Sequence, residues 1–283
     1  MRWPIGQPPF QWSGEINQES EQLRGLVALF HPLMYWRDLL GGYQMTPVGN
    51  AAAKGVDAQI GRIYSLDGTD DCAYVALPET WKLQRFTVSA WLLLATAGGG
   101  TFFSLMPRGA VADGRGIFNV ANTSGTIYSI GTGSGSFTNS NYNAAIAANT
   151  PVLITHIYDG ANMMCYINGR QDSTKAATLT IQYADKAGAY GPNPASAYIG
   201  AYHNATNSSP ATTADIVGDF NGQIGPVSLY NRALSAAEVW QLYDPQTRWQ
   251  LYAMPEYRRW FVPVVAGGII PRVVHHMRQQ GMS

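Results

Sequence analysis

A cluster of aspartates is the part of this sequence whose residue types and spacing most directly suggest chemistry. The stretch "DGTDD" places Asp67, Asp70 and Asp71 in one polar turn between two apolar runs. Calcium prefers several hard oxygen ligands at close range, and carboxylates together with turn carbonyls supply them. The alternative is that aspartate and glycine occur here because tight turns favour them. Two interpretations therefore stay open: a calcium site, or a turn without a metal.

Tyrosines with polar neighbours in predicted loops form a second group of candidates. An exposed aromatic ring can stack on a sugar, while nearby amides and imidazoles hydrogen-bond its hydroxyl groups. Ordinary packing of loop residues is the alternative. The candidate ligand-binding residues are Tyr142, Tyr190, Tyr202, His203 and Asn204.

Catalytic chemistry has little support in the sequence. Glycoside hydrolysis needs two carboxylic acids that flank the scissile bond. The glutamates are scattered, and none is paired with another on a predicted strand. The adjacent His275 and His276 are expected to lie in a solvated tail and not to bind a metal. We therefore expect a protein that is not an enzyme.

The segment 246–283 carries a third group of candidates, which are aromatic and basic. It contains five arginines and one glutamate, and proline and glycine interrupt its apolar runs. Such residues are scarce in disordered tails and enriched where proteins anchor to one another. The candidates for docking onto another subunit are Arg248, Trp249, Tyr252, Tyr257, Arg258, Arg259, Trp260 and Phe261. The alternative is that the tail folds back onto a sheet of its own domain.

Composition limits the class of protein and its partners. Charged residues make up 13% of the chain, about half of the usual ~25%. The formal net charge is +0 at pH 7, so neither nucleic acid nor an anionic membrane is an expected partner. No apolar run approaches the ~20 residues that cross a bilayer, and the first residues lack the apolar core of a secretory signal.

The two cysteines, Cys72 and Cys165, each lie in an apolar, strand-like run. Buried thiols are the favoured interpretation, and a disulfide between neighbouring strands is the alternative.

The elements that must position these candidates are mostly strands. Short apolar segments alternate with turn residues along the chain, which predicts an antiparallel sandwich or jelly roll. "RIYSLDGTDDCAYVAL" has the pattern of a β-hairpin, and Asn168–Gly169 predicts a type I′ turn. Near the C-terminus, Pro226 within an alternating strand indicates an edge or a bulge.

One short helix is predicted after that strand. Ser235 is a favourable N-cap, and Glu238 three residues later completes a capping box. Leu234 and Val239 are spaced for a hydrophobic staple, and Pro245 ends the helix. We expect this helix to pack on one face of a sheet, and we expect little other helix in the protein.

Several motifs occur in an order that resembles laminin-G-like, concanavalin A-like jelly-roll domains. They are "GLVALF", "DLLGG", "SLDGTDDCAYV", "FTVSAWL", "ITHIYDGANMMCYINGR", "AYIGA" and "FNGQIGPVSLYNRALSAAEVWQLY". The resemblance covers residues 24–245 and implies two stacked sheets, frequent calcium binding, and carbohydrate or protein ligands. Many relatives carry an acidic residue after the "G-x-I" of the last strand, whereas this chain has Gly225 and Pro226 there.

These observations predict an all-β, antiparallel two-sheet jelly-roll sandwich with one short C-terminal helix. Residues 1–23 form an extended N-terminal arm, 24–245 the jelly roll, and 246–283 a docking tail. The expected role is a non-enzymatic binding module on a virion surface, as a bacteriophage head-decoration protein or tail-associated adhesin. Its expected partners are other virion subunits, through residues 1–23 and 246–283, and cell-surface glycans, within a homo-oligomer or larger assembly. The alternative is an extracellular bacterial adhesin that binds carbohydrate, and calcium is the one cofactor under consideration.

Overall fold

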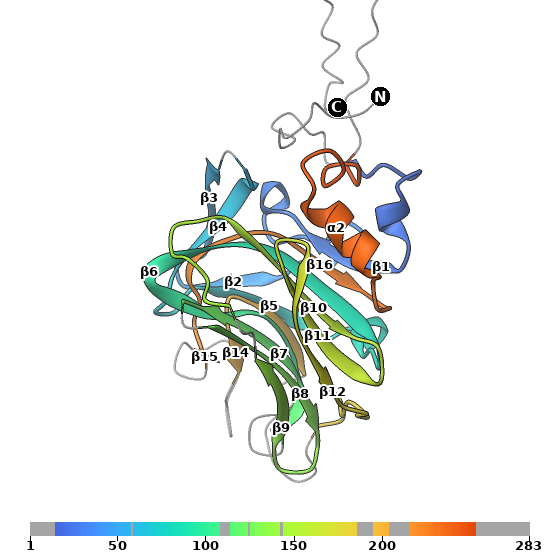
Figure 1. Cartoon of the computed structure of the whole chain (residues 1–283). Coiled ribbons are helices and arrows are strands. Elements are labelled where there is room, and N and C mark those ends of the chain that lie inside the picture. The colour runs from blue at the N-terminus through green and yellow to red at the C-terminus, as the bar shows by residue number, and fades with distance from the viewer. Residues whose placement is uncertain are drawn as a thin grey trace, which may run out of the picture.

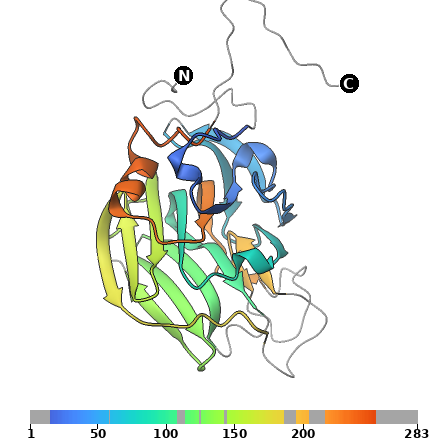
Figure 2. The same ribbon diagram turned by 90° about the vertical axis from the view of Figure 1, so that its right-hand side faces the viewer.

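The structure, a computed structural model, describes residues 15–57, 59–107, 114–123, 125–141, 144–185, 195–203 and 216–252. These residues form a sandwich of antiparallel β-sheets (Figure 1, Figure 2). The predicted two-sheet jelly-roll class is therefore confirmed. Within these ranges no helix is long and apolar enough to cross a bilayer.

The long strand β6 (Phe86–Met106) belongs to both sheets. The first sheet also contains β1 (Leu26–Phe30), β3 (Ala52–Asp57), β4 (Gly61–Asp67), β10 (Val152–Tyr158), β11 (Asn162–Ile167), β12 (Arg170–Ala176) and β16 (Asn221–Tyr230). The second sheet also contains β2 (Thr46–Val48), β5 (Cys72–Ala76), β7 (Arg115–Asn122), β8 (Gly125–Thr132), β9 (Phe137–Asn141) and β13 (Ser196–Ile199). A separate ladder joins β14 (Tyr202–His203) to β15 (Ile216–Val217).

Helical structure in the described ranges is short. The 3-10 helix η1 (Glu21–Leu23) precedes β1, η2 (Pro32–Met34) and η3 (Glu79–Trp81) lie between strands, and α2 (Ala236–Tyr243) follows β16. In α2 the predicted capping box is present, because Ser235 and Glu238 each accept a hydrogen bond from the backbone N–H of the other. Leu234 and Val239 pack in one cluster, as the staple requires. The helix prediction is therefore confirmed.

A glycine corner carries β6 from one sheet to the other. The part of β6 up to Leu94 pairs with β10 and β16, and the part from Gly99 on pairs with β7 and β13. At Gly100 φ is +139°, and an added Cβ would lie 2.3 Å from the carbonyl oxygen of Asp219. Only glycine permits this approach. The apolar runs on either side of the corner, which the sequence presents as separate segments, are thus one bent strand.

The hairpin predicted around the aspartates is wrong. β4 pairs with β3 and β16 in the first sheet, while β5 pairs with β2 and β13 in the second. The turn at residues 68–71 therefore crosses between sheets. By contrast, the predicted I′ turn is confirmed, because Asn168 and Gly169 both have positive φ and Ile167 pairs with Arg170. Pro226 lies at a register shift of β16, so the predicted bulge is also confirmed.

A polar link joins the two sheets inside the apolar core. His156 of β10 and Asn119 of β7 are both buried, with 2.6 Å between His156 Nδ1 and Asn119 Oδ1. Asn119 Nδ2 donates to the carbonyl of Phe103 at 3.0 Å, so its Oδ1 accepts the proton of His156 Nδ1. The ring of Tyr128 stacks on the imidazole, with centroids 4.9 Å apart. Burial lowers the pKa of His156 to about 3, so the imidazole is neutral in the folded protein.

The two cysteines lie in different sheets, on β5 and β11. Both are buried and free, so the favoured interpretation of buried thiols is confirmed.

The two described chain ends lie side by side at one end of the sandwich, near α2 and β1 (Figure 1, Figure 2). Ile16 and Tyr252 form an antiparallel bridge, and Gln22 Nε2 donates to the carbonyl of Thr247 at 2.9 Å. Trp249, Leu251 and Tyr252 are buried in one cluster with Leu29 of β1. Residues 15–23 and 246–252 therefore pack on the jelly roll that they flank.

Candidate functional site

The outer face of the second sheet carries a row of residues that strand register brings together. Phe118 of β7 pairs with Ser104 of β6 on one side and Ser129 of β8 on the other. Ser104 also pairs with Tyr198 of β13, which pairs with Tyr74 of β5. Residues at paired positions point to the same face of a sheet. The opposite side chains of β7, such as Asn119, enter the core, so this row lies on the face of the sheet turned away from the core, where Ser104, Ser129 and Tyr198 are buried and Phe118 is partly exposed.

Three partly exposed aromatic rings meet on this outer face. The rings of Phe118 and Tyr202 stack with centroids 5.3 Å apart and an interplanar angle of 21°. Phe137 of β9 meets Phe118 edge-on, with centroids 4.8 Å apart. We call Phe118, Phe137 and Tyr202 the aromatic face. A stacked, partly exposed ring system is a surface on which the apolar side of a sugar can lie.

Tyr202 is held in place by the short ladder next to it. It pairs with Val217 across β14 and β15, and an added Cβ at Gly218 would lie 2.5 Å from its ring. Glycine at this position therefore leaves room for the tyrosine. Burial raises the pKa of the Tyr202 phenol, so the hydroxyl is neutral and can both donate and accept a hydrogen bond.

Of the predicted sugar-binding residues, the structure places Tyr202 in an aromatic cluster. Tyr142, Tyr190 and Asn204 lie outside the described residues, and so does the side chain of His203. Sequence reasoning missed Phe118 and Phe137. A signal for Phe118 was present in "GIFNVAN", where the adjacent apolar residues Ile117 and Phe118 point to opposite faces of the strand. A strand with one face in solvent usually carries polar side chains on that face, so an apolar ring there is unusual.

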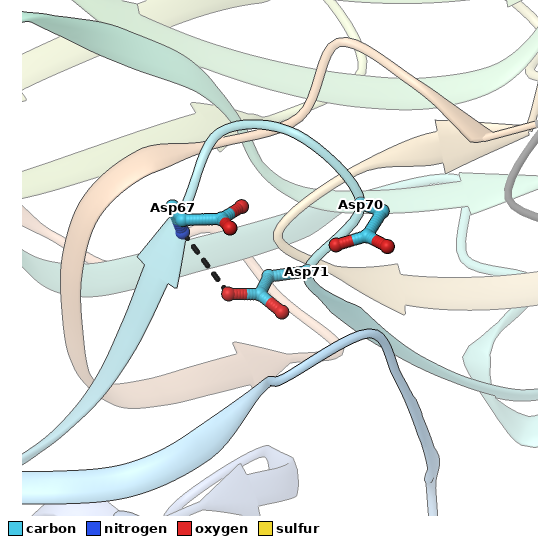
Figure 3. Close-up of side chains that lie close together, drawn as sticks. All are labelled: Asp67, Asp70 and Asp71. Carbon is cyan, nitrogen blue, oxygen red and sulfur yellow. Dashed lines mark hydrogen bonds between the residues drawn. The ribbon is translucent and has the colours of Figure 1, made fainter.

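The acidic turn brings its three carboxylates close together (Figure 3). One carboxylate oxygen from each of Asp67, Asp70 and Asp71 lies within 4.8 Å of the others. Asp71 Oδ2 accepts from the backbone N–H of Asp67 at 3.1 Å, and its Oδ1 accepts from that of Asn50. Asp67 Oδ1 accepts from the backbone N–H of Thr69 at 2.8 Å. The turn chemistry expected of aspartate is thus present, and Asp70 projects toward the other two carboxylates.

A fourth carboxylate, which sequence reasoning missed, lies near this turn. Asp219 precedes β16, and its Oδ1 is buried without a hydrogen-bond partner. Burial raises the pKa of Asp219, and the charges of Asp70, Asp67 and Asp71 raise it further. Burial raises the pKa of Asp71 as well, with a contribution from Asp67 and Asp70. The group therefore holds concentrated negative charge that a cation would offset.

Two glycines shape the surroundings of the acidic group. An added Cβ at Gly49 would lie 2.7 Å from carboxylate oxygens of Asp70 and Asp71, so only glycine allows the backbone to pack this closely against the cluster. At Gly225, where the resemblance to laminin-G-like domains implies an acidic residue, an added Cβ would lie 2.3 Å from Ile60 Cγ2. A carboxylate does not fit at that position here. Among the described residues, the three carboxylates of the turn are the group that could hold a metal ion, and Asp219 lies close enough to feel their charge.

The first part of the predicted docking tail is packed inside the domain. The Arg248 guanidinium lies 5.4 Å from the ring centroid of Trp91 on β6 and 5.2 Å from that of Trp249. Arg248, Trp249 and Tyr252 are 7%, 3% and 5% exposed. We therefore correct the prediction that these three residues dock onto another subunit. Their rings and guanidinium are buried against β1 and β6 of their own domain. Tyr257, Arg258, Arg259, Trp260 and Phe261 lie outside the described residues.

Comparison with known proteins identifies the kind of domain. The family model described as the concanavalin A-like lectin/glucanases superfamily matches residues 67–240, which is more than half of the chain. No curated protein matches the sequence.

Two kinds of solved structure illustrate the similarity of fold. Domain 4 of AbnA, a GH43 extracellular arabinanase from Geobacillus stearothermophilus, in complex with arabinotriose, has a TM-score of 0.55 and 18% identity, over 77% of this chain and 98% of that one. The binding domain of botulinum neurotoxin DC, in complex with SialylT, has a TM-score of 0.56 and 14% identity, over 79% of this chain and 52% of that one. The same domain in complex with rat synaptotagmin II has a TM-score of 0.53 and 14% identity, over 77% of this chain and 51% of that one. The chain thus spans about half the length of the neurotoxin domain.

Proposed function

Because the chain belongs to the concanavalin A-like lectin/glucanase superfamily, we propose that it is a non-enzymatic module that binds carbohydrate. The observation that carries this proposal is the aromatic face, where Tyr202 and Phe118 stack at 5.3 Å while partly exposed. The arabinotriose held by the arabinanase domain gives a precedent on this fold for a saccharide ligand. None of the described strands contains a glutamate, so the paired glutamates of a strand-borne glycosidase site have no counterpart on them.

A glycan array followed by calorimetry tests this function. The full chain is expected to bind at least one oligosaccharide, and Tyr202→Ala is expected to weaken binding about ten-fold, or ~1.4 kcal/mol, because half of the stacked platform is removed. Tyr35→Asn is the control, since Tyr35 is 75% exposed away from the aromatic face and asparagine tolerates its positive φ. A blank array with folded protein, or equal losses in both variants, would overturn the proposal.

The acidic group supports a second function, calcium binding. Asp67, Asp70, Asp71 and Asp219 offer the hard oxygen ligands that calcium prefers. The buried, unpartnered Oδ1 of Asp219 is the specific observation in favour, because a bound cation would supply its missing partner. When bound, calcium would fix the turn between β4 and β5 and offset the charge of these four carboxylates.

Thermal unfolding with added metal tests the calcium proposal. About 10 mM calcium is expected to stabilise the full chain by about 2 kcal/mol, taking a dissociation constant of about 0.3 mM. Asp70→Asn should abolish this shift, whereas Asp159→Asn, in the separate turn between β10 and β11, should keep it. Magnesium serves as the metal control, because it dehydrates reluctantly. An unchanged melting temperature in calcium, or a shift that survives in Asp70→Asn, counts against the site.

We further propose that the module is displayed on a virion, as a head-decoration protein or tail-associated adhesin, with an extracellular bacterial adhesin as the alternative. Support comes from residues 253–283, which keep the aromatic and arginine residues typical of interface anchors, among them Tyr257, Arg258, Arg259, Trp260 and Phe261. Co-purification of a chain that ends at Tyr252 with particles, next to the full chain, tests this. Loss of association in the shortened chain is expected, and unchanged association would remove the anchoring role.

A further inference from the structure

A polar groove lies where the outermost strands of the two sheets approach each other. In the described part of the chain, β9 pairs only with β8 and β12 pairs only with β11. The groove between them has a volume of about 520 Å³. Its walls carry Asn139 and Asn141 from β9, and Gln171, Asp172, Thr174 and Lys175 from β12.

Several wall groups of the groove are held in fixed orientations. Ser129 Oγ donates to Asn139 Oδ1 at 2.9 Å, and Tyr166 OH donates to Gln171 Oε1 at 3.2 Å. With these oxygens engaged, the amide nitrogens of Asn139 and Gln171 are oriented as donors for a ligand. Lys175 Nζ donates to the carbonyl of Asn139 at 2.6 Å and joins the two strand edges. Preorganised donors of this kind lower the entropic cost of binding.

The floor of the groove is also polar but rests on the core. Ser140 of β9 and Ser173 of β12 line it, and Ser173 is paired in register with the buried Cys165 of β11. Ser140 is buried, at 3% exposure.

The chemistry of the groove selects a neutral, hydroxyl-rich ligand. Asp172 and Lys175 have opposite charges, and the remaining lining groups are amides and hydroxyls, so no net charge attracts an ion. Lys175 spans the gap between the strand edges, which disfavours addition of a peptide strand there. Phe137, two residues before Asn139 on β9, points to the same face of the sheet. The groove therefore adjoins the aromatic face.

We propose that this groove is a second contact area for a neutral oligosaccharide, one end of which stacks on the aromatic face. The inference rests on the proposed carbohydrate-binding function and extends it to the ligand class: an uncharged chain of several sugar units. A saccharide that reaches from Tyr202 past Phe137 would offer its hydroxyl groups to Asn139, Asn141 and Gln171.

Calorimetry of the full chain with neutral mono-, tri- and tetrasaccharides tests the groove. The probes are arabinotriose, cellotetraose, maltotetraose and their monosaccharides. Gln171→Ala and Asn141→Ala, both exposed positions, are expected to weaken tri- or tetrasaccharide binding about ten-fold and to leave monosaccharide binding unchanged. Arg170→Ala is the matched control, because Arg170 is exposed on the same strand but does not line the groove. Circular dichroism melts verify that each variant folds.

The outcomes separate this inference from the proposed function. If Tyr202→Ala weakens binding while Gln171→Ala and Asn141→Ala behave like Arg170→Ala, the groove is not a subsite and the aromatic face stands. If the groove variants weaken binding and Tyr202→Ala does not, the groove is supported as a carbohydrate-binding site and the aromatic face is rejected as one. If none of these neutral probes binds the unmodified chain, the groove inference is overturned, and a hit on an acidic glycan in the array would still leave the carbohydrate-binding function in place.

Discussion

A chain that ends at Tyr252 is expected to remain folded, whereas a chain that ends at Pro245 is expected to lose about 6 kcal/mol of unfolding free energy. The longer form keeps Trp249, Leu251 and Tyr252, which are buried with Leu29 of β1. The shorter form removes them, and each buried apolar side chain contributes about 2 kcal/mol. It also removes Arg248, whose guanidinium lies over the ring of Trp91.

Urea unfolding of the two truncated chains and the full chain measures this difference. The contrast matters because it divides the predicted docking tail into a part that belongs to the domain, 246–252, and a remainder. Equal stability of both truncations would mean that the cluster around Leu29 adds little. Strong destabilisation of the chain that ends at Tyr252 would mean that residues 253–283 also belong to the core.

Acidification from pH 7 to pH 5 is expected to cost about 4 kcal/mol of unfolding free energy. Burial lowers the pKa of both His31 and His156 to about 3 in the folded protein, with a contribution from Arg62 at His31. In the unfolded chain both titrate near the ordinary value of 6.5. The unfolded state therefore binds more protons as the pH falls below 6.5, so stability is complete above that pH and is lost toward pH 3. Each histidine accounts for about 2 kcal/mol over the first two pH units.

Two other groups act in the opposite direction. The raised pKa values of Asp71 and Asp219 favour the folded state as they take up protons. The lowered pKa values of Glu238 and Asp159 add to the loss of stability once the pH falls below their ordinary values, so the prediction is made for the range from pH 7 to pH 5. His156→Gln provides the control, because it removes one of the two titrating imidazoles and should roughly halve the dependence between pH 7 and pH 5. A stability that does not change over this range, or an unchanged slope in His156→Gln, is incompatible with two neutral, buried imidazoles.

Local signals in the sequence were sufficient for the elements whose structure is decided locally. The capping box of Ser235 and Glu238 and the I′ turn at Asn168–Gly169 depend on residues within one turn, and both are present. The hairpin around Asp67–Asp71 failed for the opposite reason. A short polar turn between two apolar strands has the same local pattern whether the strands pair with each other or enter different sheets. Which of the two occurs is decided by the distant partners β13 and β16.

The residues of the candidate sites fall into the same two groups: those with a local sequence signal, and those brought into the site by distant contacts. Tyr202 and the acidic turn could be proposed from sequence because aromatic and carboxylate residues occur next to turn signals. Phe118, Phe137 and Asp219 join them only through the register of strands and through close approach of distant segments. The groove between β9 and β12 combines residues about thirty positions apart in the sequence, and no local spacing indicates that these two edges meet.

The most direct test of carbohydrate binding is the crystal structure of the full chain with the tightest oligosaccharide found on the array. Our proposal predicts a sugar ring stacked on Tyr202 and Phe118, with the following units directed along β9 past Phe137. A saccharide bound elsewhere, with Tyr202 and Phe118 untouched, would contradict it.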